Sequence, residues 1–395
     1  MNLLASFASV LSGAWGILLA IIILLAMVTI HEFGHYLAGK ILGFQINEFA
    51  VGFGPAILKK RSKKTGELFA LRVIPLGGYC AFEGEDFEEE QQPEEPFEEL
   101  AQPLENQEEE VKPRGAKFND QKPWKRIIVL VAGALMNYLL ALSLLFVMFG
   151  CFGCIHSYVN IYAGKTAETP AFDEEVIGYK DIVLSVDGKD IYLASDYVDA
   201  LSGRSKGDSI EIELLRKNEE GKWTEKSFSF ILQADCKFKN MTDIPGVCAA
   251  LGLDGETYAF SGVTMKEGFF KTIGSSFVYS FKIGGTVLRS LGELLTGKLP
   301  ISSMGGPVTT ISVTAQAASG GALSFLNIAA FIGVNLAVFN LLPIPALDGS
   351  KIIFCAIEWI RKKPINRKVE TIIHFVGIIF LFAFAILVDV LQFIL

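Results

Sequence analysis

The sequence predicts a polytopic α-helical membrane protein with a membrane-associated β region and one external domain of mixed α/β structure. Composition is the first observation, because 51% of the 395 residues are hydrophobic and Phe alone occurs 31 times. The second is that four apolar stretches each approach the roughly 20 residues that a helix needs to cross a bilayer. They are residues 3–30, 127–155, 322–347 and 371–388. We therefore expect about four transmembrane helices.

The first apolar stretch has two interpretations. Residues 3–30 carry no charge, which suits a transmembrane helix but also the apolar part of a signal peptide. A signal peptide begins with basic residues, and this stretch has none. We therefore expect residues 1–43 to contain the first transmembrane helix.

Lys and Arg predict how the helices are oriented. Residues 40–126 contain 13 of them and residues 351–368 contain six, whereas the first twelve residues contain none. Basic loops stay on the cytoplasmic side of a membrane, while long loops cross it largely regardless of charge. Both basic stretches are therefore expected in the cytoplasm, with the two termini and residues 156–320 outside.

An acidic stretch interrupts the first cytoplasmic region. Residues 83–110 hold 14 of the 43 acidic residues and no Lys or Arg, so the rest of the chain is net basic. Because a Glu-, Gln- and Pro-rich stretch cannot bury enough apolar surface to fold, residues 83–122 are expected to form a flexible loop, a solvated spacer rather than a docking site. The remaining basic residues are scattered or flank apolar segments, which argues against a nucleic-acid partner.

Two regions have the patterns of β structure. Residues 44–82 contain Gly-punctuated strands around a turn at 63–66, and residues 157–235 contain alternating strands and one short helical segment. Residues 236–320 are expected to be a connector and an amphipathic helix at the outer membrane face. The other segments are the second, third and fourth transmembrane helices and a cytoplasmic segment between the last two, at 123–156, 321–349, 371–395 and 350–370 respectively.

Four of the six cysteines would lie outside. Cys151 with Cys154, and Cys236 with Cys248, can each be oxidised there. Free thiols buried as small apolar groups are the alternative. A zinc site of the Cys-x-x-Cys type is disfavoured because the chain has no second such pair.

Residues 31–35 read His-Glu-Phe-Gly-His and carry the most specific chemistry in the chain. On a helix, His31 and His35 lie one turn apart on the same face, so each can give zinc one ring nitrogen. Glu32 can then act as general base and acid toward a water at the metal. Ionisable residues inside a membrane span are costly unless they bind something, which disfavours an accidental match.

A catalytic zinc site needs a third protein ligand and an open position. His156 would lie at the opposite membrane face and His374 deep in the last span, so Asp348 is the better candidate. Asp348 follows the third apolar stretch at its cytoplasmic end, after two prolines whose extended backbone is tolerated at membrane depth only where it lines a cavity. The alternative is that Asp348 caps the helix that follows it.

Six motifs occur in one order over nearly the whole chain, at residues 31–35, 52–55, 75–79, 132–138, 305–307 and 335–349. In this order they resemble the site-2 protease family of intramembrane zinc metalloproteases (peptidase family M50), in its bacterial RseP/RasP-type branch. The resemblance implies a metalloendopeptidase with one zinc ion held by His31, His35 and Asp348, and with Glu32 as the catalytic residue. It also implies that residues 157–235 are a single PDZ-like domain, and that the protein is a multi-pass protein of the bacterial cytoplasmic membrane with its active site near the cytoplasmic side.

The same resemblance implies how a substrate is held. An extended substrate strand would pair with the β region through main-chain hydrogen bonds. The expected substrate-binding residues are Asn335, Asn340, Gly52, Phe53, Gly54, Gly77 and Gly78. For the two Asn residues, hydrogen bonds between helices are the alternative. Expected partners are the lipid bilayer, transmembrane segments of single-span proteins such as anti-sigma factors and remnant signal peptides, and a site-1 protease that acts upstream.

The sequence departs from the family pattern without losing a proposed ligand. Ser350 stands where a second Gly is common, Ala134 where Pro is usual, and the acidic insert is additional. Two other function classes remain: a membrane-bound PDZ scaffold with a non-catalytic zinc site, and a cation transporter. A structural zinc site has no need of the base Glu32. A transporter would need ionisable residues along several spans, whereas here they lie at one level.

Overall fold

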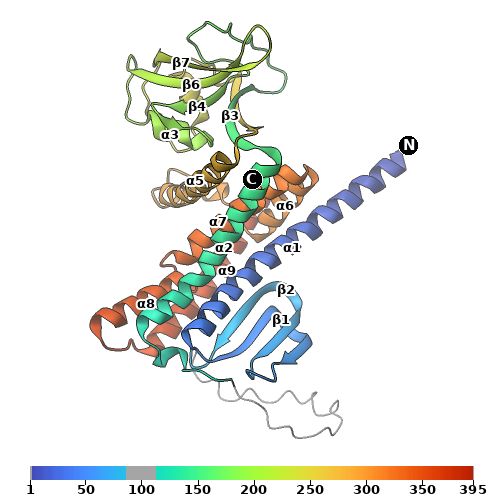
Figure 1. The fold of residues 1–395 in the computed structure, drawn as a ribbon, viewed down its shortest axis with the longest axis vertical. Coiled ribbons are helices and arrows are strands. Elements are labelled where there is room, and N and C mark those ends of the chain that lie inside the picture. The colour runs from blue at the N-terminus through green and yellow to red at the C-terminus, as the bar shows by residue number, and fades with distance from the viewer. Residues whose placement is uncertain (1, 86–112, 395) are drawn as a thin grey trace. The chain divides into compact units, whose positions relative to one another are not determined.

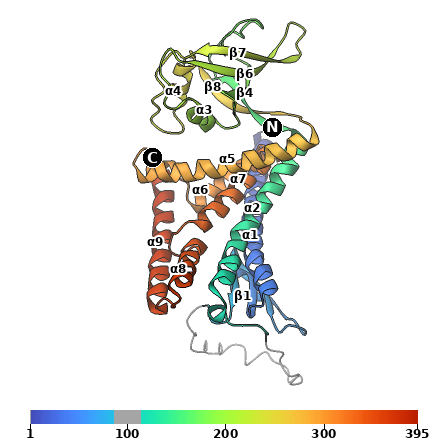
Figure 2. The ribbon, with the colours of Figure 1, turned by 60° about the vertical axis from the view of Figure 1, so that its left-hand side comes forward.

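The computed structural model describes residues 2–85 and 113–394, so residues 86–112 of the flexible loop predicted over 83–122 lie outside the described part of the chain. Residues 113–122 were expected to belong to that loop, but they are folded, because the Phe118 ring is buried against Phe44 and Phe82. The chain divides into two compact units. Unit 1 is formed by Met1–Ser143 together with Met304–Leu395, and unit 2 by Leu144–Ser303. Unit 1 consists mainly of long helices, and unit 2 of a sheet with two short helices and one long one (Figures 1 and 2).

The four predicted membrane helices are present as candidate spans. Within the described residues, the helices long and apolar enough to cross a membrane are Gly13–Leu42, Pro123–Phe152, Ala322–Leu341 and Arg367–Gln392. They belong to α1 (Asn2–Leu42), α2 (Pro123–Phe152), α7 (Ala322–Leu341) and α9 (Arg367–Ile394). Shorter helices of unit 1 are the turn η1 (Phe118–Asp120), α6 (Pro307–Ser319) and α8 (Asp348–Arg361). The third apolar run stops being helical at Leu341, before residue 347, because Pro343 and Pro345 cannot continue helical hydrogen bonding.

Small residues let the helices of unit 1 approach closely. A Cβ added to Gly34 of α1 would lie 2.8 Å from the carbonyl carbon of Ala132 in α2 and 2.9 Å from Gly133 Cα. A Cβ on Gly333 of α7 would lie 3.0 Å from the Ala141 side chain in α2. Lipid provides no hydrophobic force between helices, so such close packing is what holds membrane helices together. Helix α2 is therefore in close contact with both α1 and α7.

A carboxylate from α9 caps the beginning of α6. Asp389 accepts hydrogen bonds from the backbone N–H groups of Val308 (3.0 Å) and Thr309 (3.2 Å) and from the Thr309 hydroxyl (3.0 Å). The first N–H groups of a helix have no partner inside the helix, and a negative charge there is favourable. A Cβ on Gly306 would lie 2.6 Å from Asp389 Oδ2, which explains a glycine immediately before this helix.

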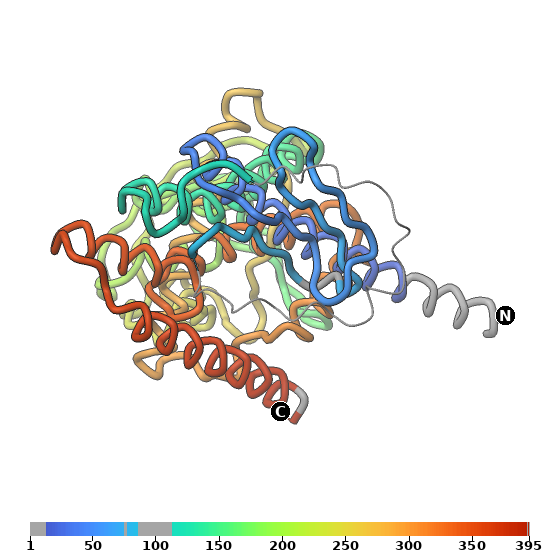
Figure 3. Tube along the Cα trace, turned by 90° about the horizontal axis from the view of Figure 1, so that it is seen from below, coloured from blue at the N-terminus to red at the C-terminus, as the bar shows by residue number. Residues whose placement is uncertain are grey.

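The expected β region is a long antiparallel hairpin of β1 (Ile46–Arg61) and β2 (Leu68–Phe82). Residues 48–51 of β1 pair with 78–81 of β2 on one side and with 68–71 on the other. Within the described residues, segment 78–82 therefore has β1 as its only strand partner and forms one edge of a small sheet. The hairpin is attached to α1 through Glu67, which accepts hydrogen bonds from Tyr36 (3.1 Å) and Lys40 (2.5 Å). Figure 3, the view from below Figure 1, shows the blue hairpin and the red α8–α9 segment on different sides of unit 1.

Unit 2 contains a six-stranded sheet whose main order is β7-β6-β4-β3-β8, with β5 paired to β4. Its strands are β3 (Cys154–Ile161), β4 (Ile182–Val186), β5 (Lys189–Asp190), β6 (Ser209–Lys217), β7 (Trp223–Ile231) and β8 (Tyr258–Met265). Its other elements are α3 (Ala194–Leu201), α4 (Ile244–Ala250), α5 (Phe269–Leu295) and the turn η2 (Ile301–Ser303). Strands β6 and β7 were expected from their alternating sequence, and their buried faces contribute to the core.

The core of unit 2 continues beyond residue 235. Val247 and Leu251, in and just after α4, are buried in the same cluster as β4 and β6, and Phe260 of β8 packs against it. Strand β8 pairs with β3 over the whole length of both strands. Residues 236–262 were expected to be a less regular connector, because α4 is short and no long apolar alternation precedes β8. They form part of the folded unit.

Helix α5 has apolar side chains on both its buried and its exposed faces. Phe270, Phe281 and Leu295 are 86%, 68% and 81% exposed, whereas Tyr279, Ile283 and Val287 are buried together with Ser276 and Ser280. The helix itself lies within the range 265–298 that the sequence predicted, and its exposed large apolar residues leave the expected place at a membrane face a prediction.

The structure has all six cysteines as free thiols, with Cys151 exposed and the others buried. Burial, together with the nearby Asp254 carboxylate, raises the pKa of the Cys248 thiol to about 11. A buried thiol with a raised pKa is unreactive. Of the two alternatives for these residues, the structure has the free thiols, which are buried at Cys154, Cys236 and Cys248 and exposed at Cys151.

Candidate metal centre

Helix α1 places the first two candidate ligands. His31 and His35 are four residues apart, so both imidazoles leave the helix on one face, and they are only 9% and 7% exposed. Their rings meet edge to face with centroids 4.7 Å apart. Gly34, between them, permits the close contact with α2 that buries this face of α1.

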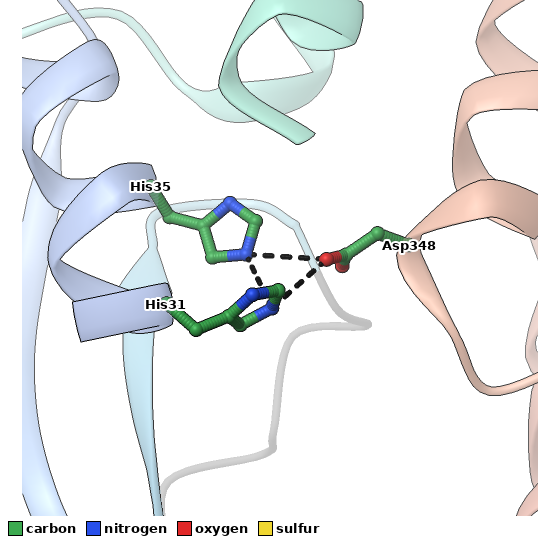
Figure 4. Close-up of side chains that lie close together, drawn as sticks. All are labelled: His31, His35 and Asp348. Atoms are coloured by element: carbon green, nitrogen blue, oxygen red, sulfur yellow. Dashed lines mark hydrogen bonds and ion pairs between the residues drawn. The ribbon is translucent and has the colours of Figure 1, made fainter. Parts of the chain in front are cut away.

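The third candidate ligand comes from the start of α8, directly after the turn that contains Pro345 and Ala346. Asp348 is the first residue of α8, and Leu347 occupies the capping position. The alternative that Asp348 caps this helix is therefore not what the structure has. The Asp348 carboxylate instead points toward the two histidines (Figure 4).

The turn that carries Asp348 has an unusual backbone and is held by α9. Ala346 has φ of 78°, a left-handed conformation that costs about 1 kcal/mol or more for a residue with a side chain. Its N–H donates a hydrogen bond of 3.2 Å to His374 Nδ1. A Cβ on Gly377 would lie 2.7 Å from the Pro345 carbonyl carbon. His374 is thus no ligand in this geometry, but it supports the turn that presents one.

The three ligand atoms have the spacing of a tetrahedral zinc site. His31 Nε2 and His35 Nε2 are 3.2 Å apart, and Asp348 Oδ2 is 3.1 Å from the first and 3.3 Å from the second. Tetrahedral ligands with metal bonds of about 2.0–2.1 Å are about 3.3 Å from one another. Asp348 Oδ2 is buried and makes no hydrogen bond within the described residues. Two ring nitrogens and a carboxylate oxygen that face one point fit a cation when each imidazole carries its proton on Nδ1.

Both imidazoles have a partner on the side away from this point. His35 Nδ1 lies 2.8 Å from the carbonyl oxygen of Val129 in α2. His31 Nδ1 faces the carboxamides of Asn137 and Asn340, at 3.4 Å and 3.5 Å from their Nδ2 atoms. Outer partners of this kind hold ligating imidazoles in orientation.

Glu32 lies beside the three ligands. It is partly exposed and interacts electrostatically with His35, His31 and Asp348. A Cβ on Gly78 of β2 would lie 3.5 Å from Glu32 Cγ. The edge segment 78–82 of the hairpin therefore begins next to the candidate catalytic carboxylate.

The predicted substrate-binding residues lie in three different places. Gly78 and Asn340 are close to Glu32 and His31 respectively. Gly52, Gly54 and Gly77 have φ of 88°, 82° and 115°, and a Cβ on Gly77 would collide with the Phe53 ring. These four residues shape the bend of the hairpin. Asn335 lies on α7, and its Oδ1 is buried without a hydrogen bond in the described chain.

Sequence reasoning missed three residues of this site. A Cβ on Gly133 would lie 2.6 Å from His35 Cε1 and 2.8 Å from His31 Cε1, so only glycine leaves room for both rings. Asn137 and His374 contact His31 and the Asp348 turn. Residues 132–138 were identified as a motif, but only their position next to α1 reveals what Gly133 and Asn137 do. His156 is in unit 2, where its Nε2 lies 3.3 Å from Glu267 Oε1.

Comparison with known proteins agrees with this geometry. The model of peptidase family M50 matches residues 19–384. The protein CPE1693 of Clostridium perfringens is 30% identical over 95% of this chain and 97% of its own length. Zinc metalloprotease RasP of Bacillus licheniformis and the regulator of sigma-W protease RasP of Bacillus subtilis are each 26% identical, over 91% of this chain and 94% of their own. This chain therefore belongs to peptidase family M50, the site-2 protease family, and is a membrane zinc metalloendopeptidase.

Proposed function

We propose that the protein cuts the transmembrane segments of single-span membrane proteins, with His31, His35 and Asp348 holding the zinc ion and Glu32 moving the proton. The observation that carries this proposal is the convergence of three ligand atoms, 3.1–3.3 Å apart, two of which belong to a helix apolar enough to span a membrane. When bound, zinc polarises the scissile carbonyl and makes water a stronger nucleophile. Glu32 takes a proton from the attacking water and returns it to the leaving amine.

A transmembrane helix must be unwound before it can be cut, because its amides are bonded internally. The edge segment 78–82 supports a way to hold the unwound strand, since it begins beside Glu32 and has a strand partner on one side only. A substrate strand added at this edge gains main-chain hydrogen bonds. Asn340, beside His31, and Asn335 on the same helix would bind other substrate backbone groups.

The proposed substrates are anti-sigma factors and remnant signal peptides, after a first cut by a site-1 protease outside the membrane. Unit 2, with its antiparallel sheet and the short helices α3 and α4, would act as a PDZ-like domain that excludes bulky ectodomains or reads a new C-terminus. The proposed location is the bacterial cytoplasmic membrane, with unit 2 and both termini outside and the zinc site near the cytoplasm.

The decisive experiment compares the wild type with Glu32→Gln in proteoliposomes that contain a single-span model substrate. The wild type is expected to cut within the transmembrane segment, as read by mass spectrometry of the fragments. Glu32→Gln should keep its zinc and cut nothing. Glu219→Gln, the same chemical change at an exposed loop residue, should cut like the wild type.

Two results would contradict the proposal. Cleavage by Glu32→Gln at the wild-type rate would remove Glu32 from the chemistry. Cleavage of soluble peptides but not of the membrane-embedded substrate would contradict the proposal that the protein cuts inside the membrane. The orientation has its own test: single cysteines at Ser62 and Ser205, labelled from outside intact cells, should react at Ser205 alone, and the reverse pattern would invert the topology.

A further inference from the structure

The two nitrogen atoms of His31 face different environments. Nε2 is 3.1 Å from Asp348 Oδ2 and 3.2 Å from His35 Nε2, which is the metal side. Nδ1 faces two carboxamides, those of Asn137 on α2 and Asn340 on α7. An imidazole that binds a metal through Nε2 keeps its proton on Nδ1 and needs an acceptor for it.

The side-chain oxygen of Asn137 is an acceptor without a hydrogen bond in the described part of the chain. The residue is 1% exposed, and its Oδ1 is buried without a hydrogen bond in the described chain, while Nδ2 lies 3.4 Å from His31 Nδ1. A buried amide oxygen without a donor costs about 1–3 kcal/mol. The two ends of a carboxamide are distinguished only by their hydrogen bonds. Turning the amide by half a rotation places Oδ1 beside Nδ1–H and satisfies both groups.

We infer that Asn137 is the positioning residue of the zinc ligand His31, with Oδ1 accepting the proton on Nδ1. The inference rests on the proposed zinc site and adds to it a residue that touches neither metal nor substrate. His35 already has the equivalent arrangement, because its Nδ1 lies 2.8 Å from the Val129 carbonyl oxygen. Helix α2 thus orients both imidazoles, one with a main-chain oxygen and the other with a side chain.

Asn340 is the competing acceptor, and its surroundings argue against it. It is partly exposed, and its Oδ1 is not among the buried atoms that lack a hydrogen bond. Its carboxamide can therefore bond to solvent or to a substrate backbone. Asn137 is closed off from both, so His31 is the group left for its oxygen.

The test measures zinc affinity of the full-length protein in detergent, by competition with a chromophoric chelator. Asn137→Ala should weaken zinc binding by about 10–100-fold, the effect usual for an outer partner of a metal ligand. Asn137→Asp, whose carboxylate still accepts from Nδ1–H, should recover affinity to within about threefold of wild type. Asn137→Leu, of similar size and without an acceptor, should be as weak as the alanine variant. Asn340→Ala should bind zinc within about twofold of wild type.

Thermal unfolding of the zinc-free forms separates positioning from a general loss of structure. Ser143→Ala, which removes an exposed hydroxyl from the same helix, is the matched control and should change neither property. The inference is overturned if Asn137→Ala binds zinc like the wild type, if Asn137→Asp fails to recover affinity, or if Asn340→Ala alone weakens it. If His31→Ala and Asp348→Ala keep wild-type zinc affinity, the proposed metal site itself is wrong.

Discussion

Each of the two units buries a cluster of charged groups, and the two clusters differ in their hydrogen bonds. In unit 2, Asp181 and Arg216 are 0% and 1% exposed. Arg216 donates to both Asp181 oxygens, at 2.8 Å and 2.6 Å, and to the carbonyl oxygens of Ala171, Glu174 and Val176. Asp181 also accepts from the Gly178 N–H at 2.8 Å. The guanidinium group there has acceptors for its N–H groups, and both carboxylate oxygens have donors.

The cluster of His31, His35 and Asp348 in unit 1 lacks that pairing. Its two ring nitrogens and one carboxylate oxygen face the same point, and Asp348 Oδ2 has no hydrogen bond within the described residues. The comparison teaches that burial of charge does not identify a functional site. What identifies it is a set of lone pairs that converge and are left for a cation. The two clusters should therefore respond to mutation in opposite ways.

The largest effect is expected for Asp348→Asn in the unpaired cluster. Loss of the anionic ligand should empty the zinc site and lower the cleavage rate at least about 10³-fold, since a metal supplies several kcal/mol of transition-state stabilisation. The zinc-free protein should unfold within about 1 kcal/mol of wild type, because Asp348 Oδ2 accepts no hydrogen bond within the described residues. Zinc content by atomic absorption and substrate cleavage measure the first effect. Unchanged zinc content would exclude Asp348 as a ligand.

Arg216→Met is the corresponding change in the paired cluster. It leaves Asp181 buried without its counter-charge, which should destabilise unit 2 by about 3–5 kcal/mol. Trp223 is the only tryptophan of unit 2, so its fluorescence during urea unfolding reports on this unit when the other three are replaced by Phe. Zinc content should not change. A loss of zinc without a loss of stability would contradict the distinction between the two clusters.

Gly133→Ala should perturb the unpaired cluster sterically. The added methyl group would lie 2.6 Å from His35 Cε1 and 2.8 Å from His31 Cε1. Overpacking of this kind costs about 1–3 kcal/mol, and displaced rings should bind zinc more weakly. Gly150→Ala on the same helix, where an added Cβ meets nothing within 4 Å, is the matched control. Equal zinc affinity of the two variants would show that the rings have room to move.

His374→Ala should have the smallest effect. The Ala346 N–H loses its acceptor, which costs about 0.5–1.5 kcal/mol, and the turn that carries Asp348 becomes less ordered. Zinc affinity should fall by less than about tenfold, whereas Val376→Ala, an exposed position on the same helix, should leave it unchanged. A loss of zinc as complete as in Asp348→Asn would make His374 a ligand rather than a support.

The parts of the site that sequence could predict depend on local spacing. His31 and His35 are related by one helical turn, and Asp348 is identifiable by its position at the end of an apolar span, after two prolines. Gly133, Asn137 and His374 act only because α2 and α9 lie against α1 and the Asp348 turn. The position of one helix along another depends on contacts between small residues, such as Gly34 against Ala132. Such contacts do not recur at a regular spacing in the sequence, so they could not be predicted from it.

Prediction of the fold from the sequence has the same limit. Apolar runs of sufficient length predicted the four candidate spans, and alternation predicted β6 and β7. The role of α4 and β8 in the core of unit 2 was missed, because β8 is defined by its pairing with the distant β3 rather than by its own pattern. Arg216, in an alternating strand, gave no sign that its partner would be Asp181, 35 residues earlier.

The contacts of α9 give the last span a mechanical consequence. His374 holds the Asp348 turn, and Asp389, fifteen residues later, caps α6. At about 1.5 Å per residue the two contacts are about 22 Å apart along one rigid helix. A tilt or a one-turn slide of this helix therefore cannot loosen one contact without straining the other. Helix α9 thus links the turn before the proposed metal ligand Asp348 to the start of α6. A change of bilayer thickness that tilts α9 would therefore shift Asp348.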